Sequence, residues 1–248
     1  MFFGIVFLCL VFFHLAPPEI LGQSSDRAPK FSPGGTEADP GWDLSALHTA
    51  RTAGYLKDLE KQVILELNKV RSDPPRYARA LLFPQGRYYS DQKLIYPGEV
   101  PILTQEGIKA FDECYKTLMK AGSAGLLTPK EGLARAARDH AIDQGKTGQT
   151  GHTGRDRSDV SIRANRYGKW GGKIGENIQY GHSAAARIVS SLLIDDGVPT
   201  RGHRKIILDP LFRHAGVASG PHPKFRHMCV LVFAAEYSEG KAEAPQKR

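Results

Sequence analysis

Cysteine is scarce in this chain, with three residues among 248: Cys9, Cys114 and Cys229. Because Cys9 lies in an apolar N-terminal stretch, only Cys114 and Cys229 remain for the rest of the chain, and they can form at most one disulfide. A fold held by several disulfides is therefore excluded, and apolar burial must stabilise the core. We expect Cys229, which lies in an unbroken hydrophobic run, to be buried and unpaired.

Several common catalytic motifs are also missing. The sequence has no H-E-x-x-H, G-x-S-x-G, P-loop or G-x-G-x-x-G pattern. These absences remove the simplest routes to a zinc protease, a serine hydrolase, a nucleotide hydrolase and a dinucleotide enzyme. No N-x-S/T sequon is present either, so N-glycosylation is not expected.

The chain lacks any block of lysine and arginine with interleaved aromatic residues. Its formal net charge is +8, and the basic excess is spread along the sequence. We therefore expect no nucleic-acid partner. A dispersed positive charge favours a solvated surface, with an unspecific attraction to anionic membrane surfaces.

The N-terminus is the one long apolar stretch. Residues 2–15 are almost wholly apolar and are followed by Pro17, Pro18 and Gly22. We interpret residues 1–22 as a secretory signal peptide, with a buried N-terminal helix as the alternative. The run is too short for a membrane span. Residues 23–54 are then predicted as a largely disordered linker, residues 55–238 as the folded domain, residues 239–248 as a charged C-terminal tail, and the protein as secreted.

Hydrophobic spacing indicates mixed helices and strands. Helices are predicted over residues 55–71, 77–83, 108–120, 129–145, 183–194 and 204–208, strands over 173–180, 215–219 and 227–237, and a long loop over 84–105. Thr128 is expected to cap the 129–145 helix, with Glu131 completing a capping box. The last strand is apolar on both faces, which predicts a central sheet covered by helices on both sides.

Four short segments gather chemically capable side chains among glycines: Gly151-His152-Thr153-Gly154, Gly175-Glu176-Asn177, Asp195-Asp196 and Gly202-His203-Arg204. Together they supply two imidazoles and two or three carboxylates. Such a set suits a metal site, an acid/base site or a structural hydrogen-bond network, so these interpretations stay open.

Taken in order, these segments resemble the CAP superfamily, the SCP domain of cysteine-rich secretory proteins, venom allergens and plant pathogenesis-related proteins. The resemblance runs from about Leu59 to Tyr237 and includes the Glu66–Arg71 segment. The run from Asn165 to Trp170 is similar to the cysteine-poor branch of the family. The resemblance implies an α+β fold, a three-layer α-β-α sandwich.

The resemblance also implies the roles of the site residues. His152 and His203 would line a cleft and hold a divalent metal, commonly zinc, beside Glu176. The second family glutamate falls where this chain has Asp195 and Asp196; we favour Asp195, and Asp196 stays open. Two protein ligands are fewer than the three of catalytic zinc, so weak binding is expected. A cleft fixed only by hydrogen bonds, without an ion, is the alternative.

We expect other polar residues near these segments to be packed or solvated rather than to bind a ligand. His140 is expected to be packed and hydrogen-bonded rather than a ligand. A solvated rim is expected from Arg163, Arg166, Lys169 and Lys173. His222, between two prolines, is placed on a turn, and a second site built with His227 is the minor alternative.

Two functional classes follow from the sequence. The first is a secreted, non-enzymatic binding module for a small apolar ligand, such as a lipid or sterol, or for an extracellular protein partner. The second is a metal-assisted hydrolase that uses Glu176 as base and a zinc-bound water as nucleophile.

Overall fold

The computed structural model describes residues 41–240. The expected signal peptide, residues 23–40 of the expected linker and residues 241–248 of the tail lie outside the described residues. Over residues 41–240, none of the helices has the length and apolar character needed to cross a bilayer.

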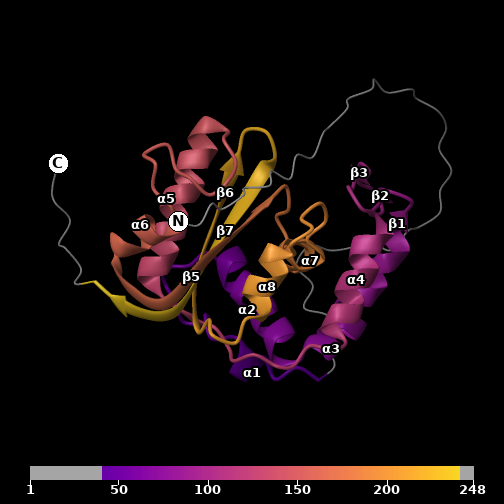
Figure 1. The fold of residues 1–248 in the computed structure, drawn as a ribbon, viewed down its shortest axis with the longest axis horizontal. Helices are drawn as coiled ribbons and strands as arrows, with labels where there is room; N and C mark the ends of the chain where they lie inside the picture. Colours follow the sequence, from indigo (N-terminus) through magenta and orange to yellow (C-terminus); the bar gives the residue numbers. More distant parts are fainter. Residues whose placement is uncertain (1–40, 241–248) are drawn as a thin grey trace.

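A four-stranded sheet in the order β4-β6-β7-β5 forms the centre of the molecule (Figure 1). Strands β5, β6 and β7 are antiparallel, and the short β4 pairs parallel with β6. Helices α5 and α6 cover one face of this sheet, and α2, α7 and α8 cover the other. The α+β, three-layer α-β-α sandwich expected from the sequence is confirmed. The bounds are β4 Thr128–Pro129, β5 Gly168–Tyr180, β6 His214–His222, β7 Arg226–Glu239, α2 Asp58–Ser72, α5 Glu131–Thr147, α6 Val160–Asn165, α7 Ala185–Ile194 and α8 Gly202–Leu208.

Strand β7 carries the two halves of the core on its two faces. Val230 and Val232 pack into the cluster under α5 and α6, whereas Leu231 and Phe233 pack into the cluster under α2, α7 and α8. The prediction of a strand buried on both sides is confirmed. Cys229 is also confirmed as buried and unpaired, and Cys114 is likewise a free, buried thiol.

Helix α2 fixes neighbouring segments through buried polar side chains. Asn68 donates to Leu47 O at 2.9 Å and accepts from Leu127 N at 2.8 Å. Arg71, fully buried, donates to the carbonyl oxygens of Ile207 and Phe212, each at 2.7 Å. A buried guanidinium needs such acceptors. The Glu66–Arg71 segment therefore ties α2 to the chain around α8.

The start of α5 differs from the predicted capping box. Thr128 and Pro129 form β4, which pairs with His214 and Ala215 of β6, so Thr128 is unavailable as a cap. The helix begins at Glu131, and its first two N–H groups donate to the carboxylate of Glu239, at 2.9 Å each. The sequence predicts Glu239 in the tail, but the residue ends β7 and belongs to the folded domain.

The C-terminal end of the expected linker is also ordered. Residues 41–54 contain the short helix α1 (Leu44–Leu47), which Asp43 caps, and Ala50 is fully buried in the core. The apolar side chains of Leu47 and Ala50 supply the burial that a disordered linker lacks. The domain therefore begins before residue 55.

The predicted loop at 84–105 contains short regular elements. Strands β1 (Tyr89–Ser90), β2 (Lys93–Leu94) and β3 (Ile102–Leu103) form a small antiparallel sheet beside helix α4 (Ile108–Leu118), as Figure 1 shows. Two-residue strands leave too little periodicity to be seen in a sequence. The chain reaches this sheet through α3 (Pro74–Tyr77), the π-helical η1 (Ala78–Leu82) and the 3₁₀-helical η2 (Phe83–Tyr88).

Candidate functional site

Strand β5 lies at the edge of the sheet and presents two neighbouring polar residues, Glu176 and Asn177. Glu176 is paired in register with Val232, and Asn177 with Leu231. Successive side chains of a strand point to opposite faces. Glu176 therefore points toward the α5 and α6 side, and Asn177 toward the α7 and α8 side.

Glu176 holds His152 on the first side. Oε1 of Glu176 lies 2.9 Å from His152 Nδ1, and Oε2 accepts from Arg163 Nη2 at 2.7 Å. Arg163 also donates to the carbonyl oxygen of His152 at 3.2 Å. The carboxylate and the guanidinium are almost completely buried, whereas the His152 side chain is 42% exposed. Part of the imidazole thus stays open to solvent.

The protonation of Glu176 follows from these contacts. Burial opposes its ionisation, but the hydrogen bond with His152 and the charge of Arg163 outweigh burial, so the pKa of Glu176 is held below its ordinary value. The group is an anion at neutral pH. An anionic Glu176 accepts a hydrogen bond from the Nδ1–H of His152, and in the neutral form of that ring the lone pair is then on Nε2.

The backbone before His152 is clamped from both sides. Gly151 adopts a φ of 99°, which disfavours any residue with a side chain. Its N–H donates to Tyr180 Oη at 3.1 Å, and its carbonyl accepts from His140 Nε2 at 2.8 Å and from Gln144 Nε2 at 2.5 Å. His140 is therefore packed and hydrogen-bonded, and it positions the His152 loop.

His203 is held in a matching way on the second side. Asp195 Oδ1 lies 2.6 Å from His203 Nδ1, and Oδ2 accepts from the backbone N–H of His203 at 2.9 Å. Asn177 Nδ2 donates to the carbonyl oxygen of His203 at 3.1 Å. Asp195 is buried and the His203 side chain is 23% exposed. Both imidazoles are thus attached to adjacent residues of β5, one directly and one through the backbone.

The two aspartates at the end of α7 bind different groups. Asp195 bonds to His203, as described, whereas the Asp196 carboxylate accepts from the backbone N–H groups of Gln105 and Glu106 at 2.6 and 2.8 Å. The geometry thus places Asp195, and not Asp196, beside the His203 imidazole. The chain can turn there because Asp195 takes the left-handed conformation at the end of the helix.

The surroundings of the two histidines bear on the expected divalent ion. A histidine whose Nδ1–H is bound by a carboxylate is the usual arrangement behind a metal ligand, because the carboxylate fixes the tautomer and orients Nε2. His152 and His203 both have it. Within residues 41–240, however, no group of three or more histidine, cysteine, aspartate or glutamate side chains is placed to hold a metal ion. The two imidazoles are therefore the candidate protein ligands, and solvent would have to complete the shell of an ion bound to them.

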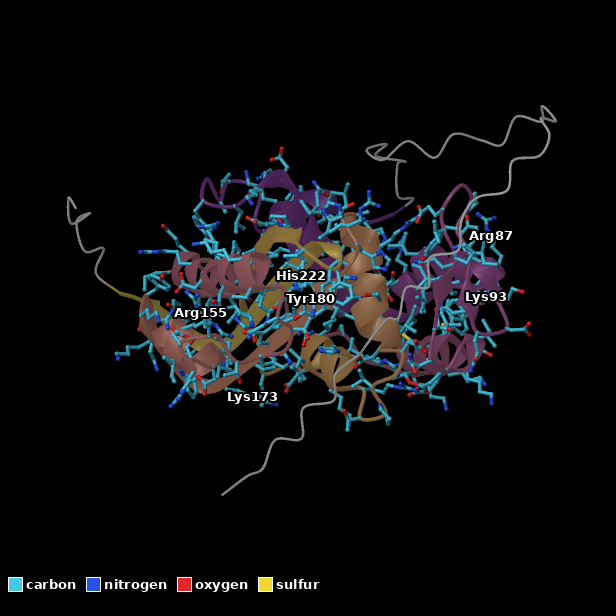
Figure 2. All side chains as sticks on the ribbon, turned by 90° about the horizontal axis from the view of Figure 1, so that it is seen from above. Arg87, Lys93, Arg155, Lys173, Tyr180 and His222 are labelled. Atoms are coloured by element: carbon cyan, nitrogen blue, oxygen red, sulfur yellow. The ribbon has the colours of Figure 1, made fainter. Side chains whose placement is uncertain are left out.

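Two expectations about neighbouring residues need correction. Arg163 is buried against Glu176 rather than part of a solvated rim, although Arg166, Lys169 and Lys173 are exposed. His222 is also buried: Nε2 bonds to Gln149 O at 3.0 Å and Nδ1 accepts from Lys224 N at 3.2 Å. Figure 2 shows it beside Tyr180, the ring centroids 5.3 Å apart. With both nitrogens occupied, His222 cannot form a second site with His227.

The sequence did not reveal Arg163, Tyr180 and Gln144 as parts of the site. Arginine alone carries no sign of burial, and the tyrosine and glutamine lie outside the four motif segments. The available signal was Glu176 in a predicted strand, because a carboxylate that is buried in a sheet requires a compensating cation nearby.

Comparison with known protein families identifies the class of protein. A family model described as the cysteine-rich secretory protein family, CAP, matches residues 67–234, more than half of the chain. The chain belongs to the CAP family. No curated protein sequence matched it.

Two solved structures are similar to this chain. One is an outer surface protein from Borrelia burgdorferi, with 17% identity and a TM-score of 0.38, over 51% of this chain and 86% of that one. Another is an extracellular protein containing an SCP domain from Bacillus anthracis, with 20% identity and a TM-score of 0.36, over 51% of this chain and 39% of that one.

Proposed function

We propose that this protein is an extracellular, non-enzymatic CAP module whose His152–His203 cleft holds a divalent ion weakly. The observation that carries the proposal is the pair of buried carboxylates, each bonded to Nδ1 of one imidazole. Two nitrogen ligands suit zinc chemically. They are fewer than the three protein ligands of catalytic zinc, so a modest affinity is expected.

The geometry favours binding over hydrolysis. In the hydrolase alternative, Glu176 would accept a proton from a metal-bound water. Both of its oxygens are already bonded, one to His152 and one to Arg163, and its pKa is held below the ordinary value. A general base works best with a pKa near the working pH and a free oxygen facing the water. Glu176 instead suits a positioning role.

We propose that the ligand is a small apolar molecule, such as a lipid or sterol, or an extracellular protein partner. The absence of the common catalytic motifs supports a binding role. The apolar residues 2–15 and the family membership support secretion. N-terminal sequencing of the exported protein tests secretion: a start near Gln23 supports it, and an intact Met1 on protein retained inside the cell contradicts it.

Calorimetric titration of the purified protein with zinc and with cadmium tests the cleft. His152→Gln and His203→Gln should each abolish binding, because one imidazole alone is a poor site. His227→Gln, at an exposed histidine of β7, is the matched control and should bind as the unmodified protein does. If His203→Gln binds zinc normally, the cleft is only a hydrogen-bond network. A sterol-binding assay on the same proteins tests the apolar ligand separately.

A further inference from the structure

Residues 83–108, which run from η2 through β1, β2 and β3 to the first residue of α4, are rich in exposed apolar side chains. Of the nine large apolar residues exposed within residues 41–240, five fall in this short stretch. Val100 is 75% exposed and Phe83 is 62% exposed. Scattered single apolar residues are normal on a protein surface, but a concentration of them marks an interaction site. We name this surface the apolar end: Phe83, Ile95, Val100, Leu103 and Ile108.

The small sheet at the apolar end has one covered and one uncovered face. Leu94 of β2 is buried, and its neighbours in register are Tyr89 and Ile102. On the opposite face, Lys93 pairs in register with Leu103, and both side chains are exposed. A cationic side chain therefore lies directly beside an apolar one on the face that the rest of the molecule leaves open.

Three carboxylates of this region are neutralised by arginines from elsewhere in the molecule. Glu99 bonds to Arg187 at 2.7 Å, and Glu106 and Glu113 each bond to Arg201 at 2.6 Å. Both arginines come from outside the region, from α7 and from the residue before α8. The acidic side chains therefore contribute little net negative charge to the surface.

The cations of the region, by contrast, have no such partners. Five exposed basic residues form no ion pair within the described part of the chain, and only Asp91 and Asp112 among the local carboxylates are equally unpaired. Figure 2 shows Arg87 and Lys93 at one end of the molecule, with Arg155 toward the other end. Three of the lysines line a hollow along α4, together with Asp112 and Glu113. The five cations are Arg87, Lys93, Lys109, Lys116 and Lys120.

We propose that the apolar end, with these five cations, docks on a lipid bilayer that contains anionic lipids. Apolar side chains would enter the boundary between headgroups and acyl chains, while the cations meet the anionic headgroups. An acidic polysaccharide would satisfy the cations but leave Val100 and Leu103 in water, so the lipid surface fits both features. The surface is distinct from the imidazole cleft, and the proposal goes beyond the proposed function without depending on it.

Vesicle sedimentation tests the charge. The purified protein should partition onto phosphatidylcholine vesicles that contain phosphatidylserine and much less onto phosphatidylcholine alone. Lys93→Gln and Lys109→Gln should each lower the partition coefficient about fivefold, which corresponds to about 1 kcal/mol for each cation near an anionic surface. Arg155→Gln, at an exposed cation toward the other end, is the control and should change nothing. Partition that the lysine variants leave unchanged would overturn the proposal.

A cysteine label tests the insertion. Both native thiols that the structure describes are buried, so a single exposed cysteine can be labelled with an environment-sensitive dye. A dye at Val100→Cys should shift to the blue on phosphatidylserine vesicles, whereas one at Ile142→Cys, an exposed residue of α5, should not. No shift at Val100→Cys, or binding to a sulfated polysaccharide but not to vesicles, would contradict docking on lipid. His203→Gln should partition normally, which separates this result from the cleft.

Discussion

Asp195 Oδ1 lies 2.6 Å from His203 Nδ1, and the Asp195 backbone is left-handed, with a φ of 56°. A non-glycine residue seldom takes this conformation, although aspartate tolerates it better than most. The turn ends α7 and directs two adjacent carboxylates to different partners: Asp195 to His203, and Asp196 to the N–H groups of Gln105 and Glu106. One backbone conformation thus decides which carboxylate serves the cleft.

Replacing these two aspartates separately tests that division. Asp195→Asn removes the charge that orients His203, and the zinc affinity should fall about 10- to 100-fold, as it does when such a supporting carboxylate is lost. Asp196→Asn should leave the zinc affinity unchanged, because its carboxylate bonds to the 105–106 backbone and not to the imidazole. Calorimetric titration measures both. An equal loss in the two variants would show that the turn, and not the Asp195 carboxylate, matters.

Replacing Arg163 should strongly destabilise the fold. Arg163→Ala leaves the buried Glu176 carboxylate without its cation, and removing one partner of a buried pair costs about 3–5 kcal/mol. Arg166→Ala is the matched control: its side chain is 35% exposed, and its loss should cost about 1 kcal/mol or less. Urea denaturation at neutral pH measures both. Similar small losses would mean that Glu176 is better solvated than its burial indicates.

His140 should make the protein sensitive to mild acid. Burial holds the pKa of His140 below its ordinary value; the nearby Glu176 opposes this effect and Arg163 adds to it. Below about pH 6.5 the unfolded chain protonates this histidine while the folded protein resists, so the free energy of unfolding falls as the pH falls, by up to about 1.4 kcal/mol per pH unit. Urea denaturation between about pH 7.5 and 5.5 spans this range and measures the slope.

The slope should be smaller in His140→Phe, which cannot take up the proton. His227→Gln, at an exposed histidine, should keep the slope of the unmodified protein. A His140→Phe variant with the full slope would assign the acid sensitivity to other groups.

Two glycines of β6 give a packing test. An added Cβ at Gly216 would lie 2.1 Å from the backbone nitrogen of Ala134 in α5, whereas one at Gly220 would lie 4.0 Å from the Ala141 side chain. Gly216→Ala should therefore force the helix off the sheet and cost about 1–3 kcal/mol or more. Gly220→Ala should be neutral within about 0.5 kcal/mol. Thermal unfolding of the two variants compares them directly, and equal midpoints would contradict this close approach.

The sequence predicted the elements whose signal is local. Periodicity located the helix at Ile108, and the two apolar faces of β7 implied the helical layers above and below it. The capping box at Thr128 was equally plausible from local sequence and was wrong, because Thr128 pairs with β6 and the helix is capped by Glu239, 108 residues from Glu131. A local sequence pattern carries no information about a partner so distant along the chain.

Only part of the candidate site could be predicted from the sequence. The segments with His152, Glu176 and His203 stand out in the sequence, since imidazole and carboxylate beside glycine are conspicuous. The burial of Arg163 was missed because a guanidinium has no local mark of its environment. Asp195 and Asp196 could be separated only when the left-handed turn was seen.

The position of Glu176 and Asn177 on one edge strand has a wider consequence. His152 lies on a loop and His203 lies in the first turn of α8, but adjacent residues of β5 bond to both: Glu176 to the His152 imidazole and Asn177 to the His203 carbonyl oxygen. The lengths of the segments between the motifs therefore do not set the separation of these two anchoring residues. A site built in this way is encoded by a few short segments that lie far apart in the sequence, as the four segments of this chain do.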